Sequence, residues 1–485
     1  MSESRVEEGN VPTRLVMAVV AAAIFISVLQ QTFVNVVIPD IRQDFGASQG
    51  QVGWVITGYL LIFAIGIPLY GRIADLYSLR GTFSLGLLVL AAGSLVCAFA
   101  PTLSLLVAGR VLQAAGAAAI PALGFASIAK LLPAGQRGTA LGLLSSSVGV
   151  GAAVGPVAGG IIAGIAGWQS LFFVTLVLSL LLAAGAWRVL PDAVSEHPVP
   201  GSVLEALHHF DVPGGLLLAS AAGLALFSVT EGQVAGFTSP LTWGSFLLAV
   251  AAGAGFLWRI RSAPEPFVSP SLFRHPGFLA AVAVGFFMMF ANVGTLVLTP
   301  FLLSEVNGLS AAGIGLVLAP GAAAVAILSP IAGRLSDRFG PRVLIRTGLL
   351  VMLLSTFGLS TLGVGASAVV VALGVLGLGL GFSIVNSPTA NAAAATLSAE
   401  ESGVGLGIFQ LIFFLGGGFG TAIVATFLAF RQDVGGAALN PLYTLESASF
   451  SDAFLIIALS AAIALAVTFG IKQRVKEPPK EAEDA

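Results

Sequence analysis

Hydrophobic and polar positions alternate along this chain in long blocks, and the apolar blocks are long enough to cross a membrane. An α-helix needs about 20 apolar residues to span the hydrocarbon core of a bilayer. Fourteen runs reach that length: 15–38, 51–70, 81–100, 103–128, 138–165, 168–190, 213–231, 240–259, 277–303, 311–332, 343–364, 367–397, 404–429 and 452–471. The pattern predicts an all-α polytopic membrane protein with fourteen spans.

The first apolar run follows Arg5 and Arg14, as the apolar core of a signal peptide would. It is about twice as long as such a core, however, and no small-residue cleavage site comes after it. We therefore expect 15–38 to be the first membrane span.

Two polar connectors divide the spans into groups of six, two and six. The first connector is 191–211 and the second is 261–275. We expect four regions: a first six-helix bundle in 1–190, connectors with two extra linker helices in 191–275, a second six-helix bundle in 276–471, and a charged tail in 472–485.

The positions of the basic residues support an even number of spans. Of the 21 lysines and arginines, all but three fall on one side of the membrane under this count; Arg42 and Arg431 fall on the other side, and Arg110 lies within the fourth span. Cytoplasmic loops carry an excess of Lys and Arg. The sequence thus predicts a protein of the inner or plasma membrane with both termini in the cytoplasm.

Composition excludes several other classes of protein. Hydrophobic residues make up 57% of the 485 residues and charged residues only 9%, against about 25% charged in soluble domains. The chain has no P-loop pattern GxxxxGK[ST], no His/Cys cluster with metal-ligand spacing and no nucleophile–base constellation. We therefore expect no enzyme, no bound metal, no cofactor, no use of ATP and no nucleic-acid partner.

The fifth predicted span contains an unusual glycine-rich stretch with Gly151, Gly155, Pro156, Gly159 and Gly160. Glycine and proline normally weaken a helix interior, but small residues in lipid let two helices approach closely. One interpretation is a close-packed helix crossing. The other is a bendable hinge helix of a transporter, which the position on the fifth of six spans favours.

A glycine–aspartate spacing occurs twice, after the second span of each six-span group. The first copy contains Gly71, Asp75 and Arg80; the second contains Gly333, Asp337, Arg338, Gly340 and Arg342. Each copy is expected to form a loop between spans, in which the Asp accepts backbone N–H bonds from the next helix. A turn rich in positive charge is the alternative, and the repeated spacing favours the helix-locking motif.

These motifs resemble those of the major facilitator superfamily, specifically its fourteen-span drug:proton antiporters. The loop motif 333–342, the fourth-span stretch 110–116, the fifth-span stretch 151–160 and the first-span stretch 29–39 carry the resemblance. The stretches 113–123 and 266–272 are further similar to Gram-positive tetracycline and multidrug exporters. The resemblance implies two six-helix bundles around a central site, alternating access, and export driven by the proton gradient.

Arg110 is the one basic residue placed deep inside a predicted span. A cation at this depth is costly, so it is expected to face a water-filled cavity or a partner. The resemblance implies a role in proton coupling, whereas snorkelling to the membrane surface is the alternative. We expect a substrate cavity lined by Gln30, Gln31, Asn35, Arg110, Gln113, Asn292, Phe409, Gln410 and Phe413, with Ser27, Asn386 and Phe414 as further candidates.

The chain lacks the acidic residues that would carry a proton at mid-membrane. The nearest ones are Asp40, Asp44, Glu231, Glu305 and Asp452, together with the aspartates of the two loop motifs. Either a peripheral acid carries the proton or coupling is weak or absent. Without an embedded acid we expect a neutral, zwitterionic or anionic substrate, or a monocation held by aromatic rings.

Three functions follow for further testing. The leading hypothesis is a monomeric proton-driven exporter of small amphipathic drug-like compounds, in contact with the bilayer. The second is export of an endogenous lipid, siderophore or metabolite, suggested by the long outer segment 431–450. The third is a receptor or scaffold that transports nothing, against which the repeated motifs argue.

Overall fold

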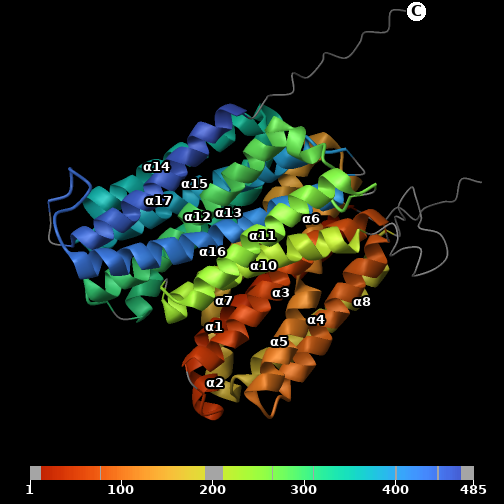
Figure 1. Ribbon diagram of the computed structural model, residues 1–485, viewed down its shortest axis with the longest axis horizontal. Coiled ribbons are helices and arrows are strands. Elements are labelled where there is room, and N and C mark those ends of the chain that lie inside the picture. Colours follow the sequence, from red (N-terminus) through yellow and green to blue (C-terminus); the bar gives the residue numbers. More distant parts are fainter. Residues whose placement is uncertain are drawn as a thin grey trace, which may run out of the picture.

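The computed structural model describes residues 13–47, 49–76, 78–191, 211–236, 238–264, 266–309, 311–398, 401–444 and 447–470. Within these ranges every regular element is a helix, and most helices run roughly along one another (Figure 1). Most of the first connector and the predicted charged tail 472–485 lie outside the described residues.

The helices follow the predicted apolar runs closely. They are α1 (Thr13–Val36), α2 (Ile38–Asp44), α3 (Gln49–Leu76), α4 (Leu79–Ala98), α5 (Leu103–Ala117), α6 (Ala119–Leu131), α7 (Ala134–Ala166), α8 (Gln169–Val189), α10 (Val212–Ala235), α11 (Pro240–Ser262), α12 (Pro276–Glu305), α13 (Ala311–Phe339), α14 (Pro341–Gly358), α15 (Ala368–Ala394), α16 (Ser402–Val434) and α17 (Ala448–Val467). Short helical turns stand at Leu272–Arg274, Leu359–Gly363 and Thr468–Gly470.

Thirteen helical segments in the described part of the chain are long and apolar enough to cross a membrane. The 33-residue helix α7 is not one of these thirteen segments. The protein is therefore all-α, and many of its helices have the length and composition of membrane spans. The total of fourteen spans stays a prediction.

The fourth predicted span is interrupted in the structure. Helix α5 ends at Ala117, Ala118 forms a turn, and α6 begins at Ala119. Pro121 explains the break, because a proline ring clashes with the carbonyl four residues earlier, here that of Ala117. The interruption directs Pro121 and Phe125 toward the centre of the molecule, where both line a cavity.

The helices pack as two groups joined along two seams. In the first group α1 packs on α7 and α8, and α4 packs on α5 and α8; in the second, α12 packs on α16 and α17, and α13 and α14 pack on α15. One seam is the contact of α7 with α13, and the other is the contact of α3 with α16. The exact division at residues 190 and 275 stays a prediction.

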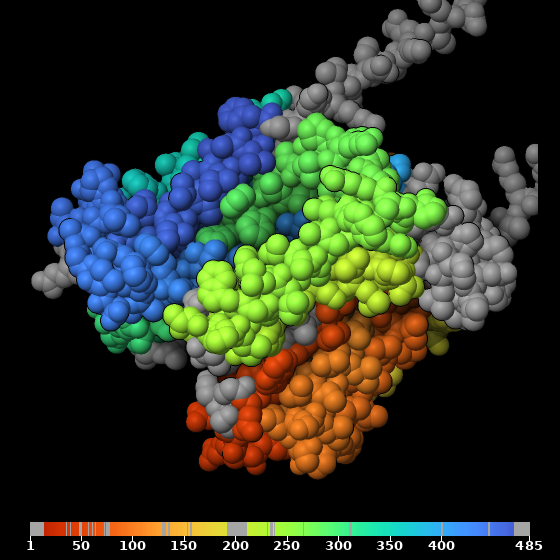
Figure 2. Space-filling model, viewed as in Figure 1, coloured from red at the N-terminus to blue at the C-terminus, as the bar shows by residue number. Residues whose placement is uncertain are grey.

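The helices α10 and α11 lie across the second seam. Figure 2 shows this pair, in yellow-green, over the boundary between the orange N-terminal helices and the blue C-terminal ones. Helix α10 packs on both α3 and α16: Leu226 lies against Gly418 of α16, and Phe227 contacts the ring of Trp54 on α3. The pair therefore bridges the two groups.

Each glycine–aspartate motif spans the end of one helix and the start of the next, and little of it is loop. Gly71 to Asp75 form the last turns of α3, and α13 continues through Phe339. Gly340 alone separates α13 from α14; its φ of 82° is one that glycine adopts without strain. The motifs thus belong to rigid helix ends, which fixes the direction in which Asp337 points.

Candidate functional site

A small cavity lies between the two helix groups. Its lining comes from six helices: Ile24, Ser27, Val28 and Gln31 of α1, Phe63 of α3, Pro121 and Phe125 of α6, Val148 of α7, Asn386 of α15, and Gln410, Phe413 and Phe414 of α16. Both groups contribute amide groups and phenyl rings. Cavities of this kind, largely apolar with a few polar groups, suit small amphipathic molecules.

The predicted cavity residues Gln31, Gln410 and Phe413 line this space, as do the further candidates Ser27, Asn386 and Phe414. Sequence reasoning missed Phe63, Pro121, Phe125 and Val148. Pro121 carried a usable signal, because a proline inside a span predicts a local break. The others are ordinary apolar residues of their spans, and only the helix arrangement shows which way they point.

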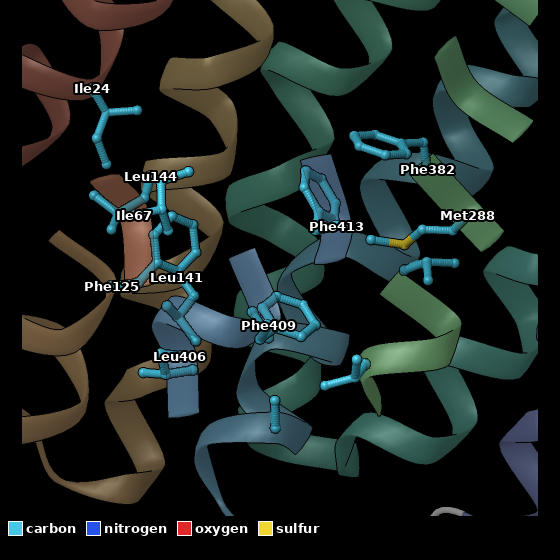
Figure 3. Packing of buried hydrophobic residues seen from close by; sticks show 14 of the residues in the cluster. Ile24, Ile67, Phe125, Leu141, Leu144, Met288, Phe382, Leu406, Phe409 and Phe413 are labelled. Atoms are coloured by element: carbon cyan, nitrogen blue, oxygen red, sulfur yellow. The ribbon is translucent and has the colours of Figure 1, made fainter. Parts of the chain in front are cut away.

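Two predicted lining residues lie elsewhere. Phe409 is one helical turn from Phe413, but its ring packs against Gly285 of α12, where a Cβ atom would come within 3.0 Å of it. Figure 3 shows Phe409 between Leu406 and Phe413, with Leu406 nearer to Leu141 and Phe413 nearer to Phe382 and Met288. Asn292 is buried on α12, which contributes no residue to the cavity lining. The side chain of Asn35 lies outside the described residues.

Arg110 is buried inside the first helix group with 1% of its surface exposed. Its Nε donates to the carbonyl oxygen of Val55 at 3.2 Å, and its Nη1 donates to Oε1 of Gln30 and to Oε1 of Gln113, both at 2.9 Å. Its guanidinium carbon lies 4.1 Å from the centre of the Tyr59 ring. Cation–π contact and several neutral acceptors together lower the cost of burying the charge.

A second layer of hydrogen bonds orients the two glutamines. Gln30 Nε2 donates to the hydroxyl of Tyr59 at 2.5 Å, and Gln113 Nε2 donates to Oγ of Ser94 at 2.7 Å. Each amide nitrogen is thereby engaged, so that each amide oxygen faces Arg110. We call Arg110, Gln30, Gln113, Tyr59 and Ser94 the Arg110 cluster; among the described residues its members are all neutral except the arginine.

The Arg110 cluster lies behind the cavity wall rather than in it, which corrects the predicted place of Gln30, Arg110 and Gln113. It is connected to the wall through Tyr59. The ring of Phe63, a lining residue, stacks on Tyr59 with centroids 5.7 Å apart, and Phe63 meets Phe414 of the other group at 5.4 Å. Sequence reasoning missed Tyr59, because no periodicity marks a tyrosine whose partners lie on other helices.

The glycines of the fifth-span motif pack α7 against α1. A Cβ atom on Gly151 would come within 2.9 Å of the carbonyl oxygen of Phe25, and one on Gly159 would lie 2.5 Å from Cβ of Phe33. A Cβ atom on Gly155 would collide with the hydroxyl of Thr32, which is 3.3 Å from the carbonyl oxygen of Gly151. The motif therefore forms a close helix crossing in this structure.

Two other motif members behave differently. Gly160 is exposed, and a Cβ atom there would meet only Val36, at 3.9 Å. Helix α7 continues without a break through position 156. The side chain of Pro156 lies outside those described, so its predicted bending role stays a prediction.

Asp337 closes one end of the α7–α13 seam. Its Oδ1 accepts from the backbone N–H of Gly138 at 2.8 Å, and its Oδ2 accepts from the backbone N–H and the hydroxyl of Thr139 at 2.8 and 2.9 Å. The predicted partner was the next helix in sequence, whereas the observed one is α7, in the other group. Ser387 of α15 also donates to the carbonyl oxygen of Gly138, at 2.9 Å.

Glycine contacts close the same end on the α3–α16 seam. A Cβ atom on Gly71 would lie 2.5 Å from the carbonyl oxygen of Gly403, and one on Gly407 would lie 3.2 Å from the backbone of Pro68. Each glycine–aspartate motif thus meets the first turns of a helix in the opposite group. We call this end of the molecule the sealed end; the side chain of Asp75 lies outside the described residues.

The arginines of the two motifs lie at helix ends near aromatic rings. Arg80 stands over Trp187 at 5.3 Å, and Arg338 stands over Phe339 at the same distance. The Nε of Arg342 is buried and makes no hydrogen bond. None of these arginines lines the cavity, so their predicted gating role rests on position alone.

No acidic residue belongs to the lining of the cavity as described. The peripheral acids with described partners are held elsewhere. Asp44 accepts from the indole N–H of Trp168 at 2.6 Å, Glu305 accepts from Gln432 at 3.1 Å, and Asp452 pairs with Arg431 at 2.7 Å. A proton that moves with the substrate therefore has no carboxylate within the cavity wall to bind.

The chain is similar to known proteins over most of its length. A family model, the Major Facilitator Superfamily, matches residues 20–421. The multidrug resistance protein Stp of Mycobacterium tuberculosis is 30% identical over 417 residues, which cover 86% of this chain and 76% of Stp. The riboflavin transporter RibZ of Clostridioides difficile is 28% identical over 418 residues, which cover 86% of this chain and 88% of RibZ.

A solved structure shows the same fold at low sequence identity. The crystal structure of the human organic anion transporter MFSD10 (TETRAN) aligns with a TM-score of 0.68 and 15% identity, covering 94% of this chain and 99% of that chain. Proteins of this superfamily are transporters rather than enzymes. The chain therefore belongs to the Major Facilitator Superfamily and is a multi-pass membrane transporter.

Proposed function

We propose that this protein exports small amphipathic compounds across the inner or plasma membrane by alternating access. The observation that carries the proposal is the cavity of phenyl rings and amides between two helix groups that meet at one end. Exchange between two arrangements of the groups would open the cavity first to one side and then to the other.

We infer that the sealed end faces the cytoplasm and that both termini lie there. The excess of Lys and Arg on this side supports that orientation.

The proton gradient is the proposed energy source, with no ATP and no cofactor. The resemblance of the motifs to those of drug:proton antiporters supports it. Because the cavity wall has no acid, the coupling group would lie outside it, and Asp337 is the acid best placed to respond to separation of the two groups. We propose that the protein works as a monomer in the lipid bilayer.

Efflux from proteoliposomes under an imposed pH gradient tests this function. Purified protein should move an amphipathic dye faster when the gradient is present, and the Arg110→Ala variant should lose at least tenfold in rate because the Arg110 cluster would collapse. Transport that ignores the gradient would contradict proton coupling. Absence of any movement across a panel of amphipathic compounds would contradict export itself.

Export of an endogenous metabolite is the second candidate. The likeness to RibZ supports transport of a cell metabolite. Arg431 also fixes the start of the outer segment, because it pairs with Asp452 and donates to the carbonyl oxygens of Gly435 and Ala437. A deletion strain that accumulates a metabolite without losing drug tolerance would favour this candidate. Lowered drug tolerance with unchanged metabolite pools would exclude it.

A further inference from the structure

We propose that the central cavity selects neutral and anionic aromatic compounds over cationic ones, because its wall has no carboxylate and the guanidinium of Arg110, whose acceptors among the described residues are all neutral, lies behind that wall. The inference rests on the proposed export function, for which it names the substrate class. Three features of the cavity and its surroundings support it.

The first feature is the chemistry of the wall. The lining offers three amides, one hydroxyl, four phenyl rings and aliphatic groups, and none of its twelve residues is ionisable. Amides donate and accept hydrogen bonds and so suit neutral or anionic groups equally well. A cation that leaves water for such a surface needs a carboxylate or a free aromatic face.

The second feature is that three of the four phenyl rings in the wall, all but Phe125, are already engaged in ring contacts. One face of Phe63 stacks on Tyr59. The ring of Phe414 meets those of Phe63 and Phe413 edge to face, with centroids 5.4 Å apart in both pairs. The Tyr59 face is occupied by Arg110 itself. A ligand ring can still stack at the margin of this group, but a compact ammonium finds no open aromatic cage.

The third feature is the positive charge behind the wall. Within the described part of the chain the hydrogen-bond acceptors of Arg110 are Val55, Gln30 and Gln113, all neutral. The two amides turn their oxygens toward the arginine, which leaves their positive N–H ends pointing away from it. The cluster therefore does not cancel the positive charge of Arg110, whose field extends beyond the cluster.

One side chain separates this charge from the cavity. Tyr59 contacts Arg110 through its ring, and its hydroxyl lies beside Ser27, a lining residue. Its ring also supports Phe63 at the wall. Charges in a low-dielectric interior act over longer distances than in water, so the cavity lies within the positive field of Arg110.

Three pyrene probes with one ring system test the inference: pyrenebutyrate, pyrenebutanamide and a pyrenylpropyl-trimethylammonium salt. Binding to the full-length protein in detergent is measured by fluorescence anisotropy, and transport is measured separately in proteoliposomes. The butyrate and butanamide should bind at least tenfold more tightly than the ammonium. This order in binding supports the inference even if no probe is transported, in which case only the export function is contradicted.

Variants sharpen the test. Gln31→Glu adds a carboxylate to the wall and should shift the ratio of ammonium to butyrate affinity by at least tenfold toward the ammonium, whereas Gln43→Glu, on the exposed surface of α2, should leave the ratio unchanged. Arg110→Met should lose the discrimination, and Arg110→Lys should keep it because the charge remains. If the Arg110 variants do not fold, the Gln31 pair decides alone. Equal binding of all three probes, preference for the ammonium, or no binding at all would overturn the inference.

Discussion

Between Gly138 and Gly149 helix α7 packs against α13, about 180 residues later in the chain, whereas between Gly151 and Gly159 the same helix packs against α1. Both contacts rely on glycine to bring backbones together. The first joins the two helix groups, and the second lies within one group. In the alternating-access function that we propose, only the first contact would have to separate, so we call it the reversible contact and the second the permanent contact.

Added bulk should disrupt the permanent contact. Gly155→Leu places a side chain where the hydroxyl of Thr32 lies, and such overpacking costs about 1–3 kcal/mol or more. We expect transport to be abolished or leaky while the protein still inserts. Efflux assays on purified protein measure this.

The control for that variant stands on the same helix. Gly164→Leu meets no atom within 4 Å of the new Cβ and should transport like the wild type. Full and tight transport by Gly155→Leu would show that the crossing of α7 with α1 tolerates separation, and the contrast between the two ends of α7 would disappear.

The reversible contact should also respond to loss of charge. Asp337→Asn keeps the shape of the side chain but turns strong bonds to Gly138 and Thr139 into weak or repulsive ones, which should destabilise the seal by about 2 kcal/mol. That value is roughly a 30-fold change in the equilibrium between sealed and open arrangements. Spin labels at Gln136 and Leu335 would report a longer distance.

Two further variants serve as controls for this distance measurement. Asp433→Asn, on an exposed part of α16, should leave the distance unchanged. Thr139→Val removes one of the three bonds to the carboxylate and should shift the equilibrium less. An Asp337→Asn protein that keeps the wild-type distance would mean that glycine packing alone holds the seal.

The smallest effect is expected at the edge of the permanent contact. Gly160→Ala adds a methyl group that meets only Val36, and alanine stabilises a helix by about 0.5–1 kcal/mol over glycine. Transport should stay within twofold and thermal stability should rise slightly, as unfolding of the purified protein would measure. A tenfold loss of transport would instead assign the motif a role in backbone flexibility.

The sequence predicted the spans and the crossing better than it predicted the cavity. Hydropathy locates a span because lipid acts on the whole length of a helix, and the four-residue spacing of Gly151, Gly155 and Gly159 places them on one face. It also singled out Arg110 with Gln30 and Gln113, because polar groups at such depth must find one another.

What the sequence could not supply was the rotation of each helix and the identity of distant partners. Phe409 and Phe413 look equivalent along α16, yet one packs on Gly285 and the other faces the cavity. The partner of Asp337 is 199 residues away and belongs to another group of helices. Local periodicity carries no information about either fact.

The Arg110 cluster also bears on how the chain is made. Val55, Gln30, Tyr59 and Ser94 all precede Arg110, and Gln113 follows it by one helical turn. A chain that emerges from the ribosome with its N-terminus first can hold these acceptors in the bilayer before the arginine arrives. A circular permutation that begins the protein at α5 would have the same contacts in its final fold, but Arg110 would enter the bilayer before Val55, Gln30 and Tyr59. We expect membrane insertion of that protein to fail at α5.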